Sequence, residues 1–180
     1  MTFTQEPSFS GRHRHEAAVQ NSGIAWTVLR PSGFFQNFSE GFLFPSIQEH
    51  DGFISASGNG SAAMIDAGDI AAVASEVFLS EGHDGKTYHL TGPTAPTMDE
   101  VALILSDAAD RVIRHESVSP ETMTDMMIGG GVPPQYAEML VRDMTAIRDG
   151  EAAQISGDVH RILGRQPVSF TQFAEQNAQV

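Results

Sequence analysis

The sequence predicts an α/β fold, with a partial parallel sheet followed by a smaller, mostly helical C-terminal lobe. Helix and strand patterns alternate in the first half of the chain. Residues 24–29 form a short, almost wholly apolar run, which is typical of a parallel strand buried on both faces. Beyond residue 95 the patterns are mostly helical. We therefore expect a flexible leader at 1–11, an α/β part at 12–95 and a helical lobe at 96–180.

The first half divides into short elements separated by glycine and proline. A helix is expected over 12–21, where Gly23 provides a left-handed cap, and a strand over 24–29, which Pro31 ends. A helical turn follows at 34–41. Two strands, 52–57 and 62–65, are expected to form a hairpin around the turn at 58–60. The next helix spans 69–80 and is capped by Asp66 or Asp69. Its buried stripe comprises Ile70, Val73, Ala74, Val77 and Phe78.

The second half begins with a second parallel strand at 87–90. Thr97 and Glu100 have the spacing of a capping box and start a helix. A strand follows at 112–118, and helices are expected from Pro120 to the glycines at 129–131 and over 134–149. A further capping box at 169–172 starts the last helix. Several methionines lie in this lobe, and we interpret them as packing residues rather than as a ligand pocket: Met123, Met126, Met127, Met139 and Met144.

Charge and composition exclude several classes of partner. The chain has 23 acidic and 10 basic residues, a net charge of −13, which disfavours nucleic acid and anionic membranes. It has no cysteine, so disulfides and thiolate catalysis are excluded. No apolar run approaches the ~18 residues of a membrane helix. We expect a cytoplasmic protein that binds a small molecule, with no nucleic acid and no membrane as partner.

The common catalytic motifs are absent from the sequence or occur in the wrong context. Residues 58–63 match G-x-G-x-x-A, but no helix follows directly, so we interpret them as a glycine turn rather than a phosphate loop. Neither tyrosine has the lysine four residues later that a short-chain dehydrogenase dyad requires. There is no G-x-S-x-G nucleophile elbow. His13 and His15 diverge on a helix, so no metal site is predicted.

Five segments, taken in order, resemble the NmrA-like branch of the atypical short-chain dehydrogenase/reductase superfamily, which includes quinone reductase-like and isoflavone reductase-like proteins. The most distinctive is the Leu-Arg-Pro turn with the aromatic residues that follow it. The resemblance extends from about Arg12 to the end of the chain. The segments are 22–38, 65–71, 86–93, 97–102 and 164–170.

The resemblance implies an extended Rossmann fold, of which this chain has a partial Rossmann-like sheet, with NADP or NAD as cofactor. In such proteins the Leu-Arg-Pro turn ends a central strand beside the nicotinamide, and ligands of open parallel sheets bind beyond the strand C-termini. The implied cofactor-binding residues are Leu29, Arg30, Pro31, Ser32 and Gly33. The implied substrate-binding residues are Phe34, Phe35, Asn37 and Phe38. The alternative for these aromatic residues is that they pack under the lobe.

This sequence departs from the family pattern in lacking the N-terminal strands and the phosphate loop. The resemblance therefore implies a truncated NAD(P)H-dependent reductase of a quinone or other flat carbonyl substrate, unable to bind the dinucleotide alone. Strands built for burial would expose an unpaired edge, so we expect a homo-oligomer or a partner chain that completes the sheet. One alternative is a non-catalytic ligand-binding or regulatory module. Another is a cofactor-free isomerase or cyclase, with His15, Glu16 and His115 as candidate acid–base groups.

Overall fold

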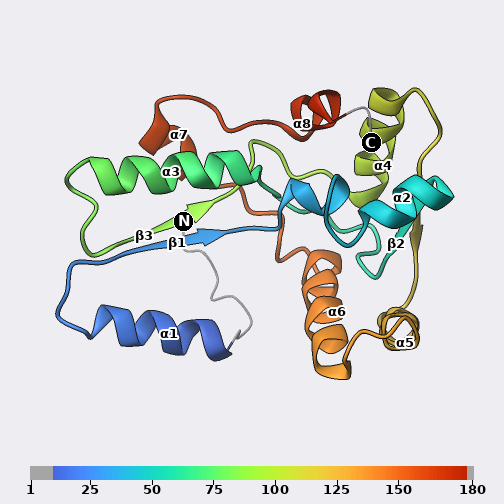
Figure 1. Ribbon diagram of the computed structural model, residues 1–180, viewed down its shortest axis with the longest axis horizontal. Coiled ribbons are helices and arrows are strands. Elements are labelled where there is room, and N and C mark those ends of the chain that lie inside the picture. The colour runs from blue at the N-terminus through green and yellow to red at the C-terminus, as the bar shows by residue number, and fades with distance from the viewer. Residues whose placement is uncertain (1–9, 178–180) are drawn as a thin grey trace.

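The computed structural model describes the chain from residue 10 to residue 177, with side chains from residue 15. The expected leader at 1–11 therefore lies almost entirely outside the described residues. The α/β class is confirmed, with two small parallel sheets surrounded by helices (Figure 1). The elements run in the order α1 Ser10–Gln20, β1 Thr27–Pro31, η1 Phe35–Phe38, α2 Phe44–His50, β2 Gly52–Ser55, α3 Ala67–Leu79, β3 Lys86–Leu90, α4 Met98–Ala109, β4 Arg114–Ser117, α5 Pro120–Gly129, α6 Pro134–Arg148, α7 Asp158–Leu163 and α8 Phe170–Gln176.

The first sheet pairs β1 with β3 in parallel, from Thr27 opposite Lys86 to Pro31 opposite Leu90. Helices α1 and α3 lie on opposite sides of these strands (Figure 1). The face toward α3 carries an apolar cluster that also includes side chains of α7, a helix that the sequence pattern did not predict. One face of the sheet is thus closed by α3 and α7.

The first strand differs from its prediction in position and in burial. It begins at Thr27 rather than at residue 24, because its ladder partner begins only at Lys86, and Ile24 is exposed as a result. All five residues of β1 are half-buried, so the prediction of burial on both faces is wrong for this chain. Within residues 10–177, β1 has a strand neighbour on one edge only.

The predicted hairpin around residues 58–60 is also wrong. Strand β2 pairs in parallel with β4, with Phe53 opposite His115 and Ser55 opposite Ser117. The segment 62–65 forms no strand and contributes only an isolated bridge between Ile65 and Phe34. A glycine turn does occur at 57–60, closed by the bond from the Gly60 amide to the Ser57 carbonyl. The turn leads into an extended connection instead of back along β2.

Helix α3 confirms one of the two expected caps. Asp66 is the N-cap, and its carboxylate accepts a hydrogen bond from the Gly68 amide. Val73 is fully buried on the predicted stripe, but Phe78 is 89% exposed, so its assignment to the stripe is wrong. The apolar cluster takes Ile70, Val73 and Val77 from this helix, whereas Phe78, the residue after Val77, lies off that face near the end of the helix.

Both capping boxes are confirmed, at Thr97 with Glu100 and at Ser169 with Gln172. At the start of α5, the helix backbone and the Ser119 hydroxyl lower the pKa of Glu121. Helix α2 was not predicted.

Helices α5 and α6 pack against each other, next to the end of β2.

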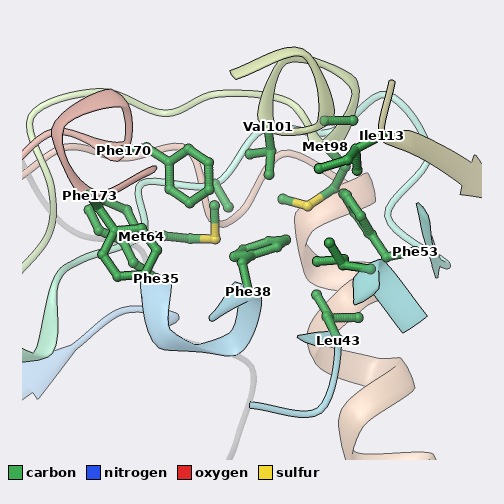
Figure 2. Close-up of a cluster of buried hydrophobic side chains, with 13 residues drawn as sticks. Phe35, Phe38, Leu43, Phe53, Met64, Met98, Val101, Ile113, Phe170 and Phe173 are labelled. Atoms are coloured by element: carbon green, nitrogen blue, oxygen red, sulfur yellow. The ribbon is translucent and has the colours of Figure 1, made fainter. Parts of the chain in front are cut away.

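The main hydrophobic core lies between η1, β2, α4 and α8 (Figure 2). Its members come from both sides of the boundary expected at residues 95 and 96, so the two parts of the chain share this core. A smaller cluster joins Ala56 to Met123, Val141 and Met144 of the helical hairpin α5–α6. These three side chains therefore pack as the sequence pattern predicts.

Candidate functional site

The segment that leaves β1 is fixed by hydrogen bonds at the carboxyl edge of the first sheet. The Ser32 amide donates to the Leu90 carbonyl at 3.0 Å, and the Ser32 hydroxyl donates to the Ala63 carbonyl at 2.6 Å. The Gly33 carbonyl accepts from the Ile65 amide at 2.8 Å. Because these partners come from two other segments, the backbone from residue 31 to residue 35 is held where a ligand of a parallel sheet is expected.

The end of β3 reaches the same place. The Gly92 amide donates to the Met64 carbonyl at 2.8 Å. A Cβ atom at residue 92 would lie 2.3 Å from the Met64 oxygen, so only glycine permits this approach. The connection at 62–65 is thus clamped between the ends of β1 and β3. A Cβ atom added at Gly33 would lie 3.6 Å from Cγ of Met64, so the Met64 side chain lies beside the predicted site.

Arg30 lies on β1 and forms a two-point ion pair with Glu16 of α1. Its Nε and Nη2 atoms lie 3.1 Å and 2.5 Å from the two carboxylate oxygens. This geometry fits the planar guanidinium and fixes α1 against the strand. Glu16 and Arg30 are both half-buried. Glu16, named above as an acid–base candidate, therefore has a positioning role in this structure, whereas His15 is exposed.

The four expected substrate-binding residues fall into two pairs. Phe35 and Phe38 are each 2% exposed, and their rings pack on Phe170 at 5.1 Å and 5.3 Å (Figure 2). This is the packing alternative considered for them. Phe34 is 40% exposed, and Asn37 is half-buried on η1. Only Phe34 and Asn37 therefore present side chains that a ligand can reach in this conformation.

Gln36 is a structural residue of the site that the sequence analysis missed. Its side-chain amide donates to the Asp66 carboxylate at 2.9 Å, and its side-chain oxygen accepts from the Ala67 amide at 3.0 Å. It thereby supplies a second cap for α3 and joins η1 to that helix. A helix cap from a residue 31 positions away carries no local sequence signal.

Asp69 holds the C-terminal segment on α3. Its side chain is completely buried, and one carboxylate oxygen lies 2.7 Å from Nη2 of Arg165. The other oxygen accepts from the Val168 amide at 2.7 Å. Asp69 is therefore not a helix cap. It holds the segment before the last capping box, and α8 then packs against Phe35 and Phe38.

The described residues contain no group of histidine and acidic side chains able to hold a metal ion. A small cavity beside Phe38, Leu105 and Phe173 has a volume of about 20 Å³, which is on the order of one water molecule. A conjugated ring system does not fit there. No helix found between residues 10 and 177 is long and apolar enough to cross a membrane.

The glycine turn at 58–60 does not have the geometry of a phosphate loop. A phosphate loop joins a strand directly to the start of a helix. Here the glycine turn at 58–60 is followed by an extended connection, and α3 starts only at Ala67. The carboxyl edge at residues 29–33 stays a predicted binding site.

No protein-family model matches the sequence. Among individual proteins, the chain is 37% identical over 153 residues to an uncharacterized oxidoreductase, YesF, of Bacillus subtilis, covering 85% of this chain and 54% of that protein. It is 34% identical over 164 residues to an NAD(P)H azoreductase of Xenophilus azovorans, covering 91% and 57%. The chain thus spans slightly more than half the length of these relatives.

Solved structures agree with these similarities. The NADPH-dependent quinone oxidoreductase of Escherichia coli superposes with a TM-score of 0.84 at 25% identity, over 96% of this chain and 62% of that one. The triphenylmethane reductase of Citrobacter sp. gives a TM-score of 0.81 at 27% identity, over 97% and 61%. These relatives and structural neighbours are members of the NmrA-like branch of the short-chain dehydrogenase/reductase superfamily, so the resemblance is confirmed over the part of them that the chain matches.

Proposed function

We propose that this chain is the substrate-side part of an NAD(P)H-dependent reductase that acts on a quinone or another flat conjugated molecule. The observation that carries the proposal is the carboxyl edge of β1 and β3, where Ser32, Gly33 and Gly92 fix one rigid backbone surface. Ligands of open parallel sheets bind at this edge. The names of the relatives, an azoreductase, a quinone oxidoreductase and a triphenylmethane reductase, support a flat substrate.

The nicotinamide end of the cofactor would lie against Leu29, Arg30, Pro31, Ser32 and Gly33, and NADP or NAD would supply the hydride when bound. The exposed ring of Phe34 would stack on the substrate. The Asn37 amide would orient a carbonyl oxygen. Phe35 and Phe38 would support this surface from below, because their rings are held in the core.

A second part, carrying the phosphate loop, would pair with the open edge of β1. The two edges of the sheet differ in a way that supports this. The outer edge of β3 is partly covered, since the His89 amide donates to the Asp158 carboxylate at 2.8 Å. The edge of β1 that faces away from β3, by contrast, has no strand beside it in the described chain. An uncovered strand edge favours addition of another strand.

The test is reconstitution with the nucleotide-binding half of a relative, added as a separate protein or as a fusion ahead of residue 10. We expect NADPH oxidation in the presence of a naphthoquinone only when both parts are present. Asn37→Ala in the reconstituted protein is expected to raise KM for the quinone by about tenfold, the effect of one lost orienting hydrogen bond. Phe78→Ala, at an exposed position far from the edge, is the matched control and should leave KM unchanged.

The outcomes separate the proposed reductase from the non-catalytic alternative. Saturable binding of the quinone without NADPH oxidation would favour a ligand-binding module. The absence of both binding and turnover in a correctly folded fusion would contradict the proposed function.

A further inference from the structure

The side chains of Ser55, His115 and Asp99 form one continuous hydrogen-bonded chain. Ser55 Oγ lies 2.8 Å from Nε2 of His115, and Nδ1 of the same ring lies 2.7 Å from Asp99 Oδ1. The three residues come from the end of β2, from β4 and from the first turn of α4. The parallel register places His115 beside Phe53. The centroids of the two rings lie 5.1 Å apart, and this packing fixes the plane of the imidazole.

The direction of each hydrogen bond follows from the groups involved. The Asp99 carboxylate only accepts, so Nδ1 of His115 carries a proton, and Nε2 of the neutral ring is an acceptor. The Ser57 amide donates to Ser55 Oγ at 3.2 Å. The hydroxyl proton of Ser55 is therefore directed at Nε2. This is the arrangement in which a histidine acts as general base toward a serine and a carboxylate holds its tautomer.

We propose that Ser55 is a nucleophile, activated by His115 and Asp99, that transfers the acyl group of a small activated ester to water. This activity is independent of the proposed reductase. The sequence contains no nucleophile elbow, but such triads are recognised by geometry and not by sequence position. Ser55 ends a parallel strand, as nucleophiles on open sheets do.

The residue after Ser55 supplies a donor for the developing oxyanion. Among the described residues, the Ala56 amide donates only to Met144 Sδ, at 3.5 Å. A thioether is a weak acceptor, so an ester carbonyl oxygen would replace it favourably. The amide that follows the nucleophile is one of the two oxyanion donors in serine hydrolases with an elbow. Met144 thus lies where the carbonyl oxygen of the substrate would bind.

Access to the Ala56 amide, the expected oxyanion donor, depends on the same methionine. Ser55 is itself 3% exposed, so an ester reaches it only when neighbouring side chains move aside. The side chains packed on Ala56 are Met123, Val141 and Met144 of the α5–α6 hairpin, and methionine adapts readily to new shapes. We therefore expect slow reaction in the native protein and faster reaction when Met144 is shortened.

The proposed ester hydrolysis has two steps, acylation of Ser55 and hydrolysis of the acyl-serine. Ser55 Oγ bonds to the carbonyl carbon while its proton passes to His115 Nε2, and the tetrahedral intermediate expels the alcohol, which takes that proton. Water then attacks the acyl-serine, giving its proton to Nε2, and the carboxylic acid leaves as Ser55 recovers a proton from His115. Neither step requires an oxidant or a metal. Asp99 is 68% exposed, so its contribution is screened by solvent and its loss should be the mildest of the three.

The experiment is labelling with a fluorophosphonate, which forms a phosphorus–oxygen bond with an activated serine and releases fluoride. Peptide mass spectrometry after prolonged incubation locates the adduct, and hydrolysis of p-nitrophenyl acetate gives the rate. We expect an adduct on Ser55 in the native protein and at least about tenfold faster labelling in Met144→Ala. His115→Gln, which keeps a hydrogen-bonding side chain but not a base, should lower the rate by about 100-fold. The exposed His160→Ala is the matched control and should label at the native rate.

The adduct position and the His115→Gln rate decide the proposal together. No adduct on Ser55 in either the native protein or Met144→Ala would overturn it, as would labelling of His115→Gln at the native rate. Near-ultraviolet circular dichroism of each variant shows that it is folded. If Met144→Ala does not fold, the native protein alone gives the answer, since its adduct is on Ser55 or is absent.

Discussion

Replacing Phe38 with alanine is expected to lower the free energy of unfolding by about 4 kcal/mol, the usual cost of truncating a core phenylalanine. The Phe38 ring is 2% exposed and packs edge-on against Phe53 at 5.4 Å and Phe170 at 5.3 Å. Its removal therefore leaves a cavity at the junction of η1, β2 and α8. Urea unfolding followed by tryptophan fluorescence measures the change.

The matched control is Phe78→Ala, which removes an equally large ring that is 89% exposed. We expect a change within about 0.5 kcal/mol for this variant. A loss at Phe38 no larger than the loss at Phe78 would show that the Phe38 ring is not part of the core, and would return it to the set of ligand-facing residues.

Replacing Asp69 with alanine is expected to lower the free energy of unfolding by about 3 kcal/mol, because the Val168 amide loses its buried acceptor and the Arg165 guanidinium loses its ion-pair partner. Both contacts are 2.7 Å long. Arg165 is half-exposed, so water can solvate its guanidinium when Asp69 is removed. The expected loss of unfolding free energy is therefore at the lower end of the range for a broken buried ion pair. Chemical denaturation is again the measurement.

Asp107→Ala is the control for this prediction, since Asp107 is an exposed carboxylate on α4. Arg165→Gln should cost less than Asp69→Ala, because the Val168 amide keeps its acceptor. Equal, small effects for Asp69 and Asp107 would contradict the role of Asp69 in holding residues 165–168 on α3. Protection of the Val168 amide from hydrogen exchange gives a local check in the same variants.

The sequence predicted best those features whose cause is local. Both capping boxes start their helices where a hydroxyl and an acidic or amide side chain have three-residue spacing. The glycines at 129–131 end α5 for a similarly local reason. The parallel pairing of β1 and β3 was indicated by their apolar pattern and by the helix between them.

Features that depend on distant partners were not predictable in the same way. A glycine turn between two short apolar runs is typical of a hairpin, but β2 instead pairs with β4, about 60 residues later. Asp69 has the spacing of a helix cap, and only the fold brings it to Val168, 99 residues away. Gln36 and Ser55 carry no local signal, because only the fold brings them to their partners Asp66 and His115.

The resemblance predicts a site at one edge of the sheet, but the sequence alone could not separate its ligand-facing residues from its core residues. Aromatic side chains in a pocket and in a core look alike in a sequence. The structure separates the buried Phe35 and Phe38 from the more exposed Phe34. The difference arises from η1, a single 3₁₀ turn that directs these two rings toward α8.

In the proposed function, this chain forms the substrate side of a dinucleotide site that a second part completes. The most direct measurement is calorimetric titration of NADPH into the chain alone and into the chain fused to the nucleotide-binding half of a relative. We expect no saturable binding to the chain alone and binding in the micromolar range, about −8 kcal/mol, for the fusion. Micromolar binding by the chain alone would contradict the need for a second part, and failure of a folded fusion to bind would contradict the dinucleotide site itself.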